Sequence, residues 1–188
     1  MERRRKRRHG MVALLGAISL LTVGAGSISL AQFTKSTTST WAFSAGTIDI
    51  STSPTVFTAV NNMLPGDAST QALTVTNGGT GALRYALSTV ATNALGAQLQ
   101  LTIKTQDSPG PGCSAFNGTS VLAATALNGG GFGSAAQGAN AGDRTLAAGA
   151  NEVLCFRVSL PLTTGNTFQG ASSAATFTFD AEQTANNP

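Results

Sequence analysis

The residue types that most hydrolytic and metal sites require are scarce in this chain of 188 residues. Its single histidine is His9, which lies in a basic cluster at the N-terminus. The rest of the chain therefore cannot supply Ser-His-Asp or Cys-His catalysis, or a zinc site that uses histidine. Apart from Glu2, the carboxylates are spread along the chain without a close acidic cluster. We predict no catalytic, cofactor-binding or metal-binding residues, and no enzymatic activity.

The two cysteines, Cys113 and Cys155, are the other candidates for special chemistry. Two thiolates alone do not complete a four-ligand structural zinc site. In an oxidising compartment an even pair is typical of one disulfide, and two buried free thiols are the alternative. Closing this loop would stabilise the fold by about 4 kcal/mol in the chain-entropy model. We predict a disulfide between the two residues.

The first 31 residues differ in kind from the rest. A basic cluster from Arg3 to Arg8 precedes an uncharged, largely apolar run that ends at Ala31. A positive region, an apolar region and small residues at the exit are typical of a secretory signal. We therefore predict an N-terminal signal helix over residues 1–31, cut by signal peptidase between Ala31 and Gln32. The run is also long enough to span a bilayer, so an uncleaved N-terminal membrane anchor is the alternative.

This division changes the meaning of the net charge. The whole chain carries a formal charge of +3, but most of its basic residues precede the apolar run. From Gln32 to Pro188, five basic residues stand against seven acidic ones, which leaves a net charge of −2. Nucleic-acid binding requires a basic stripe, so we exclude nucleic acid as a partner. We expect the protein to be secreted.

Alternation of apolar and polar residues dominates the chain after residue 43 and is typical of half-buried antiparallel strands. Turn signals rich in Gly, Pro and Asn separate the runs. We predict one all-β domain over residues 32–188, an antiparallel β-sandwich of jelly-roll type. The predicted strands are Thr47–Ser51, Thr55–Val60, Leu73–Thr76, Leu83–Val90, Leu99–Lys104, Val153–Leu160 and Thr176–Glu182.

Two segments of this domain lie outside the strand pattern. Residues 128–142 are rich in Gly and Ala and predict a long surface loop or mobile insertion. Residues 32–42 form an extended segment that could pair with an exposed sheet edge of another subunit once cleavage frees it. A first strand folded back on its own sheet, or a disordered tail, is the alternative. The donated strand would comprise Gln32, Phe33, Thr34, Lys35, Ser36, Thr37, Thr38, Ser39, Thr40 and Trp41.

Several motifs and their spacing resemble one known family. Phe43–Ile50 (FSAGTIDI) is similar to the opening "F-x-AGTLDL" of that family, and Leu64–Asp67 (LPGD) to its "PGD" turn. Leu73–Thr80 (LTVTNGGT) and Leu83–Leu87 (LRYAL) are similar to the block that follows. The likeness is good from Gln32 to about Val90 and looser beyond. On these motifs the chain resembles the TasA/CalY family, also called camelysins.

The resemblance implies a jelly-roll sandwich, export by the general secretory route, and a role as a subunit of a biofilm-matrix fibre. It implies turns at Pro65-Gly66, capped by Asp67, and at Asn77-Gly78. It also implies that the N-terminal segment is the donated strand, so that the chain forms a homo-oligomer or filament. Other matrix or cell-surface proteins are further possible partners.

Two other functions stay open. Camelysins carry a metalloendopeptidase label, although this sequence has no HExxH motif and no histidine after His9. A monomeric cell-surface adhesion module is the other alternative.

Overall fold

The computed structural model describes residues 37–187. The predicted signal helix, its cleavage site and donor residues 32–36 lie outside the described residues. The chain divides into two units, residues 1–43 and residues 44–188. In the first unit, residues 37–43 form no helix or strand, and the rings of Trp41 and Phe43 lie 5.9 Å apart. In the part of the chain described, no helix is long and apolar enough to cross a bilayer.

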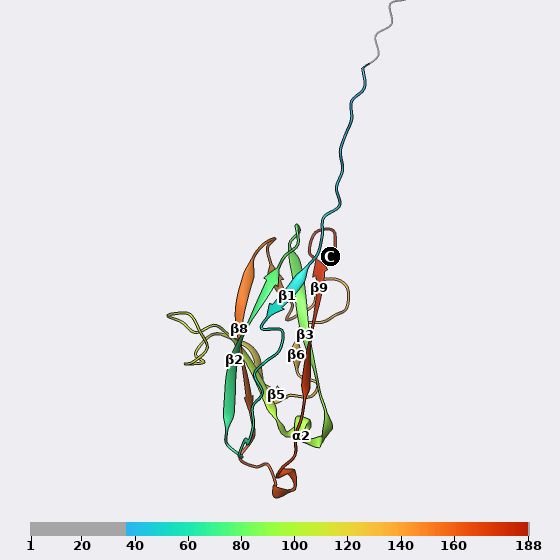
Figure 1. Cartoon of the computed structure of the whole chain (residues 1–188). Coiled ribbons are helices and arrows are strands. Elements are labelled where there is room, and N and C mark those ends of the chain that lie inside the picture. The colour runs from blue at the N-terminus through green and yellow to red at the C-terminus, as the bar shows by residue number, and fades with distance from the viewer. Residues whose placement is uncertain (1–36, 188) are drawn as a thin grey trace, which may run out of the picture. The chain divides into compact units, whose positions relative to one another are not determined.

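The second unit is built from two antiparallel sheets (Figure 1). The five-stranded sheet has the order β1 (Ile50–Ser53), β2 (Ala68–Asn77), β8 (Asn151–Ser159), β4 (Gln100–Thr105) and β5 (Ser120–Ala126). The other sheet centres on β3 (Leu83–Ala91), which pairs with β9 (Ala175–Gln183) on one side. On its other side β3 pairs with the short strands β6 (Gly131–Phe132) and β7 (Arg144–Leu146). The antiparallel β-sandwich predicted from the sequence is confirmed.

The core lies between the two sheets and follows from the period of two along each strand. Leu73 and Val75 of β2 face inward, as do Leu154 and Phe156 of β8 and Leu101 and Ile103 of β4. Burying one such side chain fully contributes about 1.5–3 kcal/mol. The buried side chains of this core are Leu73, Val75, Leu83, Tyr85, Leu87, Ala91, Leu99, Leu101, Ile103, Leu127, Phe132, Leu146, Leu154, Phe156 and Leu160.

Local sequence patterns predicted only some of the helices and strands. The strand predicted at Thr55–Val60 is wrong, because this segment forms no strand. β1 ends immediately before Pro54, which has no backbone N–H to donate to a ladder. Strands β5, β6 and β7 were not predicted, nor were the helix α2 (Asn93–Gln98) and the 3₁₀ turn η1 (Asn166–Phe168). All of these are short or lack an alternating pattern.

The two turns expected from the resemblance are present. The Asp67 carboxylate accepts a hydrogen bond of 2.7 Å from the backbone of Leu64, and Gly66 has a φ of 99° that favours glycine. Asn77 is fully buried at the end of β2. Its amide donates to the carbonyl of Leu146 in β7 at 3.2 Å and to that of Ala147, the next residue, at 3.0 Å. The Asn77 turn thus links the two sheets as well as reversing the chain.

The predicted disulfide between Cys113 and Cys155 is present and anchors the segment 106–119 to the outer face of β8. Phe116 packs beside it, with the Arg157 guanidinium 3.8 Å from the ring centroid. Asp107 is buried in the same segment, and its carboxylate accepts hydrogen bonds from the backbone amides of Ala115 at 2.7 Å and Asn117 at 3.0 Å. These contacts form a second, smaller core outside the sandwich.

We predict that reducing the disulfide lowers the free energy of unfolding by about 4 kcal/mol, because it spans 42 residues and restricts the unfolded chain. Urea denaturation with and without reductant would measure the change. The double variant Cys113→Ala with Cys155→Ala serves as the control, since reductant should not shift its midpoint. Equal midpoints for the reduced and oxidised wild-type protein would contradict the prediction.

Candidate functional site

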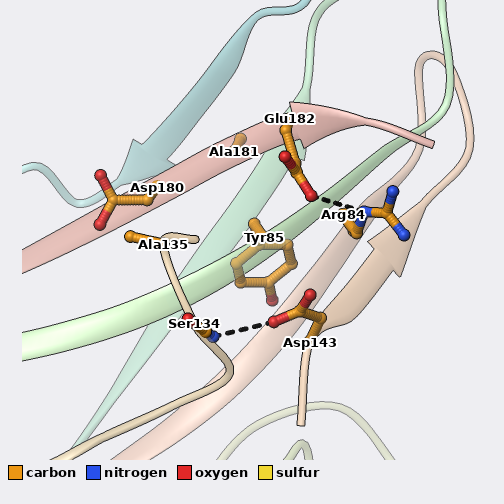
Figure 2. A pocket seen from close by; sticks show the side chains of 8 residues that line it. All are labelled: Arg84, Tyr85, Ser134, Ala135, Asp143, Asp180, Ala181 and Glu182. Atoms are coloured by element: carbon orange, nitrogen blue, oxygen red, sulfur yellow. Dashed lines mark hydrogen bonds and ion pairs between the residues drawn. The ribbon is translucent and has the colours of Figure 1, made fainter. Parts of the chain in front are cut away.

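A small cavity lies between β3, β9 and the segment 133–143 (Figure 2). Its volume is about 40 Å³, which is enough for a few water molecules and too small for a peptide substrate. Three of its lining residues are acidic and one is basic, which makes it the first place to look for chemistry. The lining comprises Arg84, Tyr85, Ser134, Ala135, Asp143, Asp180, Ala181 and Glu182.

Two carboxylates of this cavity hold the chain in place. Glu182 accepts hydrogen bonds from Arg84 Nε at 2.7 Å and from the Gly138 backbone at 3.0 Å. Asp143 accepts from the backbones of Ser134 and Asn140, each at 2.9 Å. Figure 2 shows the Arg84 and Ser134 contacts on either side of the Tyr85 ring. Asp143 and Glu182, which are far apart in the sequence, therefore both anchor the segment 133–143. The Gly/Ala-rich range 128–142, which was predicted as a long surface loop or mobile insertion, contains the strand β6.

A second polar cluster joins the two sheets from within. Tyr85 of β3 is 1% exposed, and its hydroxyl donates to Glu152 of β8 at 2.5 Å. Arg144 of β7 forms an ion pair with the same carboxylate. Burial, followed by the hydrogen bond to Glu152, raises the pKa of Tyr85, and the bond to Glu152 raises the pKa of Arg144. Tyr85 is thus held neutral, which suits a structural contact and not an activated nucleophile.

We predict that Tyr85 stays protonated in the folded protein above pH 10, the ordinary pKa of tyrosine. Because the folded-state pKa is raised, the contribution of Tyr85 to stability is complete below about pH 10 and is lost as the pH rises further. Tyr85 is the chain's one tyrosine, so tyrosinate absorbance reports it alone.

The Glu152→Gln variant should titrate at lower pH, since two causes of the shift come from that carboxylate. Glu182→Gln is the matched control, because Glu182 does not bond to Tyr85. A reversible titration near pH 10 in the folded wild-type protein would refute the assignment.

The two long sides of the sandwich are closed to different degrees. On the side of β5 and β6, the chain crosses directly from one sheet to the other. The Leu127 amide donates to the Leu99 carbonyl at 2.7 Å, and the Thr89 hydroxyl of β3 donates to the Gly130 carbonyl at 2.8 Å. These bonds join the two sheets along this side, although β5 itself pairs with β4 alone.

The opposite side is open. β9 pairs with β3 alone, so its outer edge has no strand partner among the described residues. β1 ends at Ser53, opposite Thr74, so residues 68–73 of β2 pair with β8 only. Figure 1 shows β1 and β2 on this side, with β9 in the other sheet. Two rows of backbone groups without a strand partner therefore border the same side of the sandwich.

The segment 54–61, here called the strap, covers this open side. Phe57 inserts its ring between the sheets, with centroids 5.3 Å from Phe156 of β8 and 5.2 Å from Phe177 of β9. The side-chain amide of Gln71 in β2 binds the backbone of Thr58 twice, accepting from its N–H and donating to its carbonyl, each at 2.7 Å. In the part of the chain described, no backbone hydrogen bond joins the strap to β2.

Sequence reasoning missed the strap, Phe57 and Gln71. A signal was nevertheless present, because Gln71 stands two and four residues before Leu73 and Val75 and so shares their core-facing side. A polar residue at a core position is a local inconsistency of the kind that functional sites retain.

The described residues do not fit a catalytic zinc site. Zinc in hydrolytic sites takes His, Cys, Asp and Glu ligands. Within residues 37–187 no three such groups lie close enough together to hold a metal ion, and both cysteines are in the disulfide. The carboxylates of Asp143 and Glu182 already accept the hydrogen bonds described above. His9 lies outside the described residues.

No curated protein matches the chain. A family model described as "Camelysin metallo-endopeptidase" matches residues 4–100, which is more than half of the 188 residues. The match includes β1, β2 and β3, both turn motifs, and the strap. It agrees with the resemblance found in the sequence, and the chain belongs to the camelysin family.

Proposed function

We propose that the chain is a non-enzymatic structural subunit of an extracellular, biofilm-matrix filament that assembles by strand donation between copies. The observation that carries this proposal is the open side. Among the described residues, the edge of β2 residues 68–73 that faces away from β8 has no strand partner, and neither has the outer edge of β9. Unpaired edges of this kind are templates for an incoming extended segment. The resemblance of the sequence motifs to the TasA/CalY family implies the same role.

The N-terminal segment is the proposed donor. Its described part, residues 37–43, forms no strand and consists mainly of Thr and Ser with two aromatic residues. The open edge of β2 lacks a neighbouring strand, and the β-prone N-terminal segment lacks an edge to pair with. The two therefore complement each other. Because the donor and the acceptor are different surfaces, the contact is heterologous and repeats from copy to copy, which builds a filament.

Strand donation requires a free N-terminus outside the cell. Cleavage by signal peptidase between Ala31 and Gln32 would provide it, and an uncleaved anchor would hold the donor at the membrane. We place the filament in the extracellular matrix or at the cell surface, where other matrix or surface proteins could join it. Main-chain hydrogen bonds and buried apolar side chains would supply the binding free energy.

The second candidate function comes from the family description, which names a metallo-endopeptidase. The fit test above opposes it, because the described residues provide no set of zinc ligands. The open side also differs from a catalytic cleft, since it offers backbone groups and aromatic rings instead of acids or bases.

We predict that protein beginning at Gln32 forms filaments in electron microscopy and that protein beginning at Ala42 stays monomeric, because the truncation removes the donor. Trp41 is the chain's one tryptophan, so its emission should shift to the blue as the longer form assembles. Monomers from both forms would refute self-assembly and favour the adhesion module. Filaments from both would exclude residues 32–41 as the donor.

We also predict that the purified protein, supplied with Zn²⁺, does not cleave casein, because its folded domain lacks a suitable donor set. A gelatin or casein gel, run with and without a chelator, measures this directly. Chelator-sensitive cleavage that copurifies with the protein through a final size-exclusion step would contradict the proposed non-enzymatic role and support the peptidase function.

A further inference from the structure

We infer that the strap is an internal place-holder, which covers the acceptor edge of β2 in the free subunit and is exchanged for the donated strand of a second copy. This inference rests on the proposed function. It adds the position at which the donor docks and the step that controls docking.

The strap is held by few contacts. Phe57 is its one partly buried residue, whereas Val56 and Val60 on either side of it are 79% and 45% exposed. Its polar contact with β2 is the Gln71 amide on the Thr58 backbone. A neutral hydrogen bond adds little net stability in water, since both groups bond to solvent when it breaks. The strap can therefore leave the edge without unfolding either sheet.

Gln71 is placed to hold the strap and not to build the core. It lies opposite Phe156 of β8, while Leu73 lies opposite Leu154 on the same inward side. An apolar side chain at this position would bury more surface against Phe156. The amide instead reproduces, from a side chain, the pair of hydrogen bonds that a neighbouring strand would make through its backbone.

A donated strand would satisfy the edge better than the strap does. The backbone groups of residues 68–73 that point away from β8 form no backbone bond with the strap, whereas an extended segment would form a ladder with them. The occupant must also replace Phe57 between Phe156 and Phe177. Trp41, the last residue of the proposed donor, supplies an aromatic side chain for this place. The N-terminal segment of a second copy meets both requirements.

Protection of an exposed edge from unwanted pairing is the simpler role for such a strap. The two roles differ in one observable. A strap that only protects stays in place when filaments form, whereas a place-holder is released as residues 68–73 become paired.

The test uses the chain expressed from its full sequence and recovered from the medium or the membrane. Hydrogen exchange is measured on monomers and on filaments. We expect the peptide 54–61 to exchange faster in the filament and the peptide 68–73 to exchange more slowly. In parallel, Gln71→Met keeps the side-chain length but removes both bonds to Thr58, and should lower the critical concentration for assembly about tenfold. Gln169→Met, at an exposed position in the segment between β8 and β9, is the matched control and should leave the critical concentration unchanged.

The outcomes separate the two proposals. Filaments in which the strap keeps its protection, or in which Gln71→Met assembles like Gln169→Met, would overturn the place-holder and leave the filament function standing. Failure of the wild-type chain to assemble under any condition would refute the filament function, and the place-holder with it.

Discussion

Pairing of backbone groups is the constraint on which the rest of this structure depends. Each strand of a sheet presents N–H and C=O groups on two sides, and a sandwich that does not close into a barrel must leave some of them without a partner. Here the chain crosses from one sheet to the other between β5 and β6 at one margin. At the other margin, among the described residues, the edge of β2 residues 68–73 that faces away from β8 has no strand partner, and neither has the outer edge of β9. The strap covers that margin but does not complete it.

The remaining polar contacts keep the sandwich rigid away from the open side. Tyr85, Glu152 and Arg144 join the two sheets inside the core, and Asn77 joins them again at the end of β2. The disulfide fixes a long segment to the outer face of β8. With both sheets held by these contacts, an exchange of the strap would alter one margin while the rest of the fold stays unchanged.

Membership of the camelysin family and the absence of a zinc-ligand set in residues 37–187 are compatible if the family's shared feature is the sandwich and not a catalytic site. Four of the described carboxylates accept hydrogen bonds from backbone amides. Asp143 and Glu182 hold the segment 133–143, Asp67 caps a turn, and Asp107 orders the segment inside the disulfide loop. Each therefore has a structural role that accounts for its position.

The sequence by itself determined the class of fold, because a period of two is a local property that one strand displays without its neighbours. It also determined the two turns, through Pro65-Gly66 and Asn77-Gly78, and the family, through motifs of fixed spacing. The disulfide followed from a count of two cysteines.

Only the tertiary structure decided which edges stay open. Strand pairing depends on partners far apart in the chain, and β1 stops at Ser53 although the alternating pattern resumes at Thr55. The same reason explains why Gln71 had no evident role in the sequence. Its amide finds a partner only because β2 lies beside the strap in the folded chain. That contact and the placement of Phe57 between Phe156 and Phe177 both come from three-dimensional packing, which a local pattern does not reveal.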